Sequence, residues 1–505
     1  MPQRNELSMT RAPLPSNRRF VRLLLFCGVL SMTGCVVGPK YRPPVITPPA
    51  AYKEVAPQRS PDATLWKPAA PQDTAPRGNW WEIYKQPELN DLENKLNASN
   101  QNIAQSYQNF MAARALVREA RSNYYPTVTT DPAYTRTRSS ASLAGPHAAS
   151  VNLTSSEFNF PFTASWEPDV WGRVSSTVRQ YASQAQAGAA ELANVRLSQQ
   201  ANLAIYYFDL RGQDSLIALY QRTVEAYKKS LDLTKKLNAL GIDSSQDVAQ
   251  ADLSLETAQS TLINLRIARA QYEHAIAVLI GEPPSSFSLP VLELTAAAPQ
   301  VPPGVPSELL QRRPDIAQAE RAMAAANALI DVQTTTFYPS FSISATGGFQ
   351  GNQVGNWLTW TSRFFSAGPS AAFTIFDAGA RRAVLANYQA QYEADVAAYR
   401  QTVLTAFQQT EDYLAAQHYL ADQLTQQQVA INAAQKYLDL ANVRFRTGID
   451  SFLNVYTAQT SLLTQQETFI DLRVSQMASN VQLIEALGGG WDRVQLPSPK
   501  EVAAR

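Results

Sequence analysis

The residue types that most often carry chemistry in proteins are scarce in this 505-residue chain. The three histidines, His147, His274 and His418, are widely separated and have no second ligand type at metal spacing. The two cysteines, Cys27 and Cys35, both lie within the first 35 residues, so nothing after them can form a disulfide or carry thiol chemistry. The sequence contains no Gly-x-Ser-x-Gly, His-Glu-x-x-His or phosphate-binding glycine loop. We therefore expect no catalytic residue, no metal site and no cofactor site, and we predict that the protein is not an enzyme.

Cys35 is the one residue whose surroundings predict a covalent modification. Arginines cluster around the start of the apolar run 21–30, which is too short to span a bilayer, and Met32-Thr33-Gly34 then lead into Cys35. This order resembles the lipobox of bacterial lipoproteins, in which the cysteine becomes the lipidated first residue of the mature chain. We predict a signal peptide over residues 1–34 and a lipid such as palmitate on Cys35, followed by a lipidated, Pro-rich tether over residues 35–76. The alternative is an ordinary signal peptide with a chance cysteine.

Val36 follows Cys35 where many lipoproteins have an aspartate, and lipoproteins without that aspartate are by resemblance usually sent to the outer membrane. Composition limits the partners of such a protein. Hydrophobic residues make up 45% of the chain, which predicts a folded protein. Lysine and arginine (43) nearly balance aspartate and glutamate (42), so the chain has no basic footprint for a nucleic acid.

The mature chain contains an internal two-fold repeat. Ile103-Ala104-Gln105 recurs as Ile316-Ala317-Gln318 at an offset of 213, and Gly241-Ile242-Asp243-Ser244 recurs as Gly448-Ile449-Asp450-Ser451 at an offset of 207. The drop in offset locates a length difference between these blocks. We assign residues 77–282 to the first repeat, 283–306 to a Pro-rich linker, 307–491 to the second repeat and 492–505 to a C-terminal tail.

Each repeat predicts a helix, two strands, a very long helix and a returning helix. The two long stretches are nearly free of glycine and proline, and 67 residues would make a helix of about 100 Å. Alternation of apolar and polar residues predicts strands with one apolar face. The predicted long helices are 174–240 and 381–447, the return helices are 245–280 and 451–487, and the strands are 126–137, 158–166, 340–346 and 369–376.

The predicted elements restrict how such a chain could cross a membrane. No run of 18 apolar residues follows the signal segment, so the strands would have to span the bilayer. A spanning sheet must close on itself, and four strands are too few for a barrel. Three copies would give a 12-stranded β-barrel continued by a periplasmic α-helical barrel. The alternative is a soluble antiparallel coiled coil with a small β-cap.

Several motifs in order also resemble a known family. They are Cys35-Val36-Val37-Gly38-Pro39, Trp80-Trp81, Trp166-Glu167-x-Asp169-x-Trp171-Gly172, Arg312-Arg313-Pro314-Asp315, Phe376-Asp377-x-Gly379 and Leu487-Gly488-Gly489-Gly490-Trp491. Together they resemble the outer-membrane efflux channels of the TolC type, in the lipoprotein branch with OprM and NodT. The resemblance implies a mainly α fold with membrane β-strands, assembled as a homotrimeric channel-tunnel.

The resemblance also implies a function and partners. The channel would passively export drugs or toxic small organics through the outer membrane of a Gram-negative bacterium, as part of a multidrug resistance system. Its partners would be a periplasmic adaptor (membrane fusion) protein, an inner-membrane RND transporter and outer-membrane lipid. The alternatives are the duct of a type I protein secretion system and a structural coiled-coil lipoprotein without a pore. The lipid anchor and the closing Gly488-Gly489-Gly490-Trp491 resemble the small-molecule branch.

Two aromatic turns lie where a strand leads into a long helix. In these turns glycine permits a tight backbone and the aromatic rings suit the membrane interface. We assign this role to Trp166, Trp171, Gly172, Phe376 and Gly379.

The hairpin tips are the predicted gate, because tightening their last turns would narrow the tube. Gly241 and Gly448 mark tips that would contact the adaptor. In relatives, the second-repeat tip carries acidic residues facing the lumen, whereas this chain has Asn454 and Thr457 at those positions. We therefore predict an apolar ring at Leu453, rimmed by Asp243, Asp247 and Asp450. The alternative is that Asp243 and Asp450 only cap the return helices.

Overall fold

The structure is a computed structural model that describes residues 37–49, 51–54, 78–140, 153–302, 304 and 306–504. The predicted signal peptide, Cys35 and most of the predicted tether lie outside the described residues. The chain divides into two compact units. We call them the sheet unit (residues 1–41, 118–180 and 326–391) and the helical unit (residues 42–117, 181–325 and 392–505).

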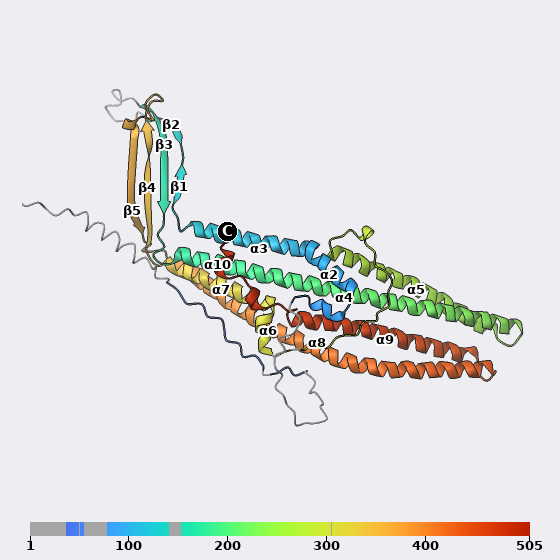
Figure 1. Ribbon diagram of the computed structural model, residues 1–505. Helices are drawn as coiled ribbons and strands as arrows, with labels where there is room; N and C mark the ends of the chain where they lie inside the picture. Colours follow the sequence, from blue (N-terminus) through green and yellow to red (C-terminus); the bar gives the residue numbers. More distant parts are fainter. Residues whose placement is uncertain are drawn as a thin grey trace, which may run out of the picture. The chain divides into compact units, whose positions relative to one another are not determined.

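Most described residues are helical, and the longest helices have the predicted positions (Figure 1). α4 (Arg173–Ala239) and α8 (Ala380–Arg446) have 67 residues each, and α5 (Ser245–Leu279) and α9 (Phe452–Ala486) have 35 each. The shorter α-helices are α2 (Pro87–Ser99), α3 (Gln101–Ser122), α6 (Pro306–Arg312), α7 (Pro314–Thr335) and α10 (Pro499–Val502). Short 3₁₀ helices are η1 (Trp80–Tyr84), η3 (Pro284–Ser286), η4 (Trp360–Ser362) and η5 (Arg493–Gln495).

The two long helices end in the same way because each is followed by a glycine with positive φ. Gly241 (φ 73°) donates its N–H to the carbonyl of Asn238, and Ile242 donates to Leu237. Gly448 (φ 71°) and Ile449 repeat this pair of bonds at the end of α8. This is the Schellman arrangement, which satisfies carbonyls at a helix end and needs a residue that adopts positive φ without strain.

The sheet unit contains one antiparallel sheet. Its strands pair in the order β1-β3-β4-β5, and β2 also pairs with β3. The strands are β1 (Thr127–Thr130), β2 (Ala133–Arg138), β3 (Thr154–Trp166), β4 (Ser340–Gly351) and β5 (Arg363–Ala372).

The strands differ from the sequence prediction in their extent. β3 begins at Thr154 and not at residue 158, and β4 ends at Gly351 and not at residue 346. The predicted strand 126–137 is divided at Asp131-Pro132, opposite Phe160-Pro161 of β3, where two prolines without an N–H interrupt the hydrogen-bonded ladder. The last strand was predicted at 369–376 but lies at Arg363–Ala372, because the register pairs Phe349 of β4 with Arg363. The Phe-rich residues before position 369 therefore belong to the strand and not to the preceding loop.

The register gives the sheet one apolar and one polar face. Along β4, serine, threonine and glutamine alternate with phenylalanine, isoleucine and alanine, as the period of a strand requires. Across the ladder, Phe160 is opposite Phe349 and Ala164 is opposite Ala345, whereas Thr163 is opposite Thr346. Between β3 and β4, apolar side chains thus meet on one face and polar side chains share the other.

The helical unit has its main core where η1, α2, α4 and α9 meet. Trp80 and Trp81 of the double-tryptophan motif are 2% exposed and Leu89 is fully buried, and all three belong to the core cluster around Phe208 of α4. A second apolar cluster joins the two long hairpins nearer their tips, with Tyr227, Leu231, Leu255, Phe452 and Val455 among its members.

The linker between the repeats is fastened to this core by charged side chains. Asp214 is completely buried and accepts hydrogen bonds from Arg211 (2.8 Å), Arg269 (2.7 Å) and the backbone N–H of Leu292 (3.0 Å). Arg269 also donates to the carbonyl of Leu289 (2.8 Å). A buried carboxylate with several donors is stabilised only if all of them stay in place, so this network fixes the linker on α4 and α5.

Within the part of the chain that the structure describes, no helix is both long enough and apolar enough to cross a membrane.

Candidate functional site

The turn from β3 into α4 is held by side chains on both flanks. Asp169 accepts from the backbone N–H groups of Val174 and Ser175 at 2.8 Å each, so it caps the start of α4. Trp171 is half-buried, donates from its indole N–H to the carbonyl of Pro339 (2.7 Å) and lies 5.0 Å from the ring of Tyr338. The turn therefore joins the end of β3 to the segment that leads into β4.

Two further predicted interface residues belong to the same turn. Trp166 is half-buried at the end of β3 and donates to the carbonyl of Tyr124 (3.0 Å). Gly172 has φ 79° and is buried, so the tight backbone predicted for it is present.

The turn from β5 into α8 is built differently. Gly379 (φ 88°) donates its N–H to Asp377 (3.0 Å), and Arg381 donates to the same carboxylate (2.5 Å). Phe376 is 84% exposed and makes no ring contact among the described residues. The structure thus gives both predicted glycine turns and leaves Phe376 uncovered within one chain. The role of these turns at a membrane interface stays a prediction.

At the tip between α4 and α5, the predicted acidic residues have two different environments. The Ser244 hydroxyl accepts from the backbone N–H of Asp247 (3.1 Å) and donates to the Asp247 carboxylate (2.7 Å), so Ser244 and Asp247 together start α5. Asp243 is half-buried, and its Oδ2 has no hydrogen-bond partner. Burial, and to a lesser extent the nearby Asp247, raises the pKa of Asp243.

At the tip between α8 and α9, the corresponding aspartate is paired. Arg444, in the last turn of α8, donates from Nε to Oδ2 of Asp450 (2.5 Å) and from Nη2 to Oδ1 (3.2 Å). Hydrogen bonding from Arg444 lowers the pKa of Asp450. The sequence prediction missed Arg444, and its six-residue separation from Asp450 across a glycine turn is the only signal that could have indicated the pair.

The alternative role for the two aspartates, as caps of the return helices, is wrong. The N-cap of α5 is Ser244 and that of α9 is Ser451. The charged and polar groups around the two aspartates are different: Asp247 acts on Asp243, whereas Arg444 and Asn454 act on Asp450. One chain therefore does not bring its acidic residues into a single cluster.

The remaining predicted gate residues lie in the first turns of α9. Leu453 is 56% exposed, and its carbonyl accepts from the hydroxyl of Thr457 (2.9 Å). Asn454 is exposed, while its neighbours Phe452 and Val455 are buried in the tip cluster. The first turn of α9 thus presents Leu453, Asn454 and Thr457 on the side away from the packed face, as a lumen-facing role requires.

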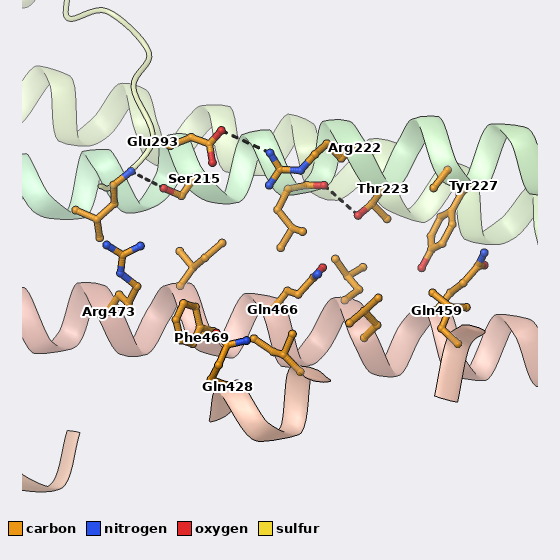
Figure 2. A pocket seen from close by; sticks show the side chains of 18 residues that line it. Ser215, Arg222, Thr223, Tyr227, Glu293, Gln428, Gln459, Gln466, Phe469 and Arg473 are labelled. Carbon is orange, nitrogen blue, oxygen red and sulfur yellow. Dashed lines mark hydrogen bonds and ion pairs between the residues drawn. The ribbon is translucent and has the colours of Figure 1, made fainter. Parts of the chain in front are cut away.

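Polar contacts that sequence reasoning missed join the two hairpins. Tyr220 of α4 donates to Glu467 of α9, and Gln459 of α9 donates to the hydroxyl of Ser230 of α4 (3.2 Å). Beside them lies a cavity of about 510 Å³ between α4, α8, α9 and the linker. Figure 2 shows Arg473 of α9 at one end of it and the ion pair of Arg222 with Glu293 (3.5 Å) on the α4 side. In the part of the chain that is described, no group of three His, Cys, Asp or Glu side chains is placed to hold a metal ion.

Comparison with known proteins identifies the family. The sequence model of the Outer membrane efflux protein family matches residues 92–282 and 305–489. The chain belongs to this family. It is an outer-membrane component of an efflux system, and the family consists of channel proteins.

Individual relatives match along almost their whole length. The chain is 32% identical over 464 residues to the toluene efflux pump outer membrane protein TtgC of Pseudomonas putida, covering 91% of this chain and 93% of TtgC. It is 28% identical over 470 residues to the outer membrane protein OprJ of Pseudomonas aeruginosa, with 92% and 94% covered.

Solved structures agree with this assignment. The outer-membrane channel OprN superposes with a TM-score of 0.81 at 27% identity, covering 90% of this chain and 100% of OprN. The Campylobacter jejuni CmeC outer membrane channel has the same fold, with a TM-score of 0.80 at 20% identity and coverage of 92% and 97%.

Proposed function

We propose that three copies of this chain form a passive conduit through the outer membrane, with four strand positions per chain closing a 12-stranded β-barrel and the long helices forming a periplasmic tube. Substrates would be small organic compounds delivered by a periplasmic adaptor and an inner-membrane RND transporter. A lipid on Cys35 would add a second attachment to the membrane. The two repeats of each chain would contribute similar parts of the tube wall. The family model matches two separate segments of the chain, which supports the internal repeat.

The faces of the sheet support the barrel. β1 and β2 follow each other along the same edge of β3, so each chain offers four strand positions with two open edges. Open edges in hydrocarbon leave backbone groups without partners, and pairing with neighbouring chains would satisfy them. Aromatic rings gather at both ends of the apolar face, as in the girdles of membrane barrels. Phe158 and Trp357 meet at one end (5.8 Å), and Trp171 and Phe341 at the other (6.5 Å).

Uncovered apolar stripes on two helices support the assembly of several copies. At 3.6 residues per turn, the exposed apolar residues of α5 fall within about 80° of one another around the helix, and those of α8 beyond residue 400 within about 120°. Each is 44–64% exposed in the single chain, so each stripe needs a partner. A stripe on α5 of one copy and a stripe on α8 of the next form a head-to-tail contact that closes into a ring. The stripes consist of Leu253, Ile263, Ile267 and Val278 on α5 and of Leu404, Tyr419, Val429, Tyr437, Leu440 and Val443 on α8.

The names of the relatives support small organic substrates over exported proteins. TtgC is named as part of a toluene efflux pump, ArpC of Pseudomonas putida as part of an antibiotic efflux pump and SrpC as part of a solvent efflux pump. The amphipathic sheet argues against a coiled-coil lipoprotein without a pore, because such a protein has no use for an apolar outer face.

Complementation of an efflux defect tests the proposal. A Gram-negative strain that lacks its own outer-membrane efflux component, but retains adaptor and RND transporter, should regain tolerance to an antibiotic or toluene when it expresses this chain. Cells should also accumulate less ethidium. A chain with Ile267→Asp and Leu440→Asp, expressed at the same level, should not complement. Restored secretion of a protein toxin without any change in tolerance would contradict the small-molecule assignment.

A further inference from the structure

The first described residues of the chain, Val37 to Pro39, are fastened to the sheet unit. Val37 donates its N–H to the carbonyl of Trp171 (3.4 Å), and Asn327 of α7 donates from Nδ2 to the carbonyl of Pro39 (3.2 Å). Gly38 lies against Asp331, one helical turn after Asn327 on the same face of α7. Residues 37–39, which lie in the segment predicted as an extended tether, are therefore docked on α7 and the Trp171 turn.

Gly38 fits this position because it has no side chain. A Cβ at residue 38 would lie 2.1 Å from Oδ1 and 3.0 Å from Cα of Asp331, and the backbone has φ 141°, which favours glycine. Any other residue would both strain the backbone and push the segment away from α7. The glycine thus allows the chain to touch the helix backbone directly.

Asp331 is the residue of α7 against which Gly38 packs. Its side chain is 2% exposed, its Oδ2 accepts from Arg179 of α4 (3.0 Å), and its Oδ1 has no hydrogen-bond partner. Burial raises the pKa of Asp331 to about 6, against the opposing effect of Arg179. Gly38 lies directly against this carboxylate, so the docked segment packs on a side chain that is already buried.

The repeat supplies an independent observation. At the offset of 213 that relates the halves of the sequence, Asn327 corresponds to Arg114 of α3. In the helical unit, Arg114 donates to the carbonyls of Val502 (3.3 Å) and Ala504 (3.0 Å) in the C-terminal tail, and Val502 is 1% exposed. Equivalent positions on α3 and α7 therefore each bind a backbone carbonyl at one end of the chain.

We propose that α7 carries a docking site, formed by Asn327 and Asp331, for residues 37–39, so that this part of the segment after Cys35 is fixed beside the Trp171 turn. The site recognises a backbone carbonyl, through Asn327, and requires a residue without a side chain at position 38. In the first repeat, Arg114 binds carbonyls of the C-terminal tail from the equivalent position. This inference rests on the proposed lipidation for its purpose, but the docking itself does not require the lipid.

Proteolysis of the purified, full-length mature protein tests the docking. Lys40 is followed by Tyr41, whereas Arg42 is followed by Pro43, a bond that trypsin does not cut, so cleavage after Lys40 reports release of the segment. Gly38→Ala and Asn327→Ala should each be cut about tenfold faster than wild type, because cleavage follows the population of the released segment. Gly78→Ala is the matched control, since Gly78 also has positive φ (121°) but has no atom within 4 Å of the added Cβ. Cleavage of Gly38→Ala at the wild-type rate would overturn the proposal.

The same proteolysis experiment on a non-lipidated protein distinguishes docking on α7 from attachment through the lipid. The same proteins exported behind a signal peptide without a lipobox, with Cys35→Ser, should keep the protection at Lys40. Loss of protection in this form would show that the lipid holds the segment and would contradict the α7 site. The mass of the N-terminal peptide reports acylation of Cys35 separately, so an unacylated but protected chain would refute the lipid and leave the docking site intact.

Discussion

Arg444 and Asp450 are joined by a hydrogen-bonded ion pair of 2.5 Å across the turn between α8 and α9, and the equivalent turn between α4 and α5 has no such pair. At the offset of 207, Arg444 corresponds to Leu237 and Asp450 to Asp243. Asp243 therefore has a buried carboxylate oxygen without a hydrogen-bond partner, whereas both oxygens of Asp450 accept hydrogen bonds from Arg444. The tips of the two repeats are alike in backbone but differ in the side-chain contacts that stabilise them.

Arg444→Leu, which copies the residue of the first repeat, should loosen the turn that leads to Leu453. We expect a higher conductance or open probability of the assembled channel in planar bilayers. The ion pair also has a defined pH dependence: the pKa of Asp450 is lowered from its ordinary value of 3.8, so the pair contributes above that value and is lost as pH falls below it. The conductance of the wild-type channel should therefore approach that of Arg444→Leu only under strongly acidic conditions. Equal conductance of the two channels at pH 7 would exclude a role of the ion pair in closing the channel.

Leu453→Ala should widen the predicted apolar ring. Since Leu453 is 56% exposed in the single chain, the change should cost little stability while raising conductance. Leu358→Ala, at a site with 55% exposure in the loop between β4 and β5, is the matched control and should leave conductance unchanged. A Leu453→Ala channel that conducts like wild type would show that Leu453 is not part of the gate. Asp247→Ala, measured in the same assay, tests the predicted acidic rim around Leu453.

Tyr220→Phe should weaken the connection between the two hairpins. Burial and the hydrogen bond to Glu467 raise the pKa of Tyr220, so the hydroxyl stays protonated and donates at every physiological pH. Loss of a hydrogen bond to a carboxylate should cost about 1–2 kcal/mol in the stability of the helical unit and should favour separation of α4 from α9. Tyr107→Phe, on an exposed tyrosine of α3 outside the apolar stripes, is the control in thermal unfolding and conductance. Identical unfolding curves for the two variants would show that the Tyr220 hydroxyl has no net effect.

Glu93→Gln should stabilise the protein at neutral pH. Glu93 is completely buried in α2, both of its carboxylate oxygens lack partners, and burial raises its pKa well above the ordinary value of 4.5. The folded state then binds a proton more tightly than the unfolded state, so stability falls as pH rises above 4.5. The variant should therefore be more stable than wild type at pH 7, and the difference should shrink as pH falls toward 4. The exposed Glu225→Gln serves as control, and a pH-independent difference would contradict the assignment.

Ile267→Asp or Leu440→Asp should dissociate the assembly, because each places a charge within an apolar stripe that requires a partner. Val494→Asp, at a position with 91% exposure outside the stripes, should leave the oligomer intact. Native mass measurement distinguishes these outcomes, and a wild-type mass for all three variants would rule out the stripes as the contact between copies.

Several features of the fold could be read from the sequence because local chemistry decides them. The long helices follow from two stretches almost free of glycine and proline, and their ends from Gly241 and Gly448, which allow a positive φ. The alternation in β3 and β4 predicted strands with one apolar face, and the register confirms it.

Other features depend on distant contacts and could not be predicted. The division of the first strand depends on Pro161, which lies opposite the break only after the register is set. The docking of Gly38 on Asp331 joins positions 293 residues apart, and the residues that form the site have ordinary helical spacing. The environments of Asp243 and Asp450 differ because of Arg444, which no repeat or motif marks.

The most direct test of the central claim is the single-channel conductance of the purified protein in planar bilayers, measured together with its native mass. The account predicts a trimer with a small conductance that rises in Leu453→Ala and Arg444→Leu and is unchanged in Leu358→Ala. A monomer, or a trimer that stays silent in all of these variants, would contradict the conduit and restore a structural role for the long helices.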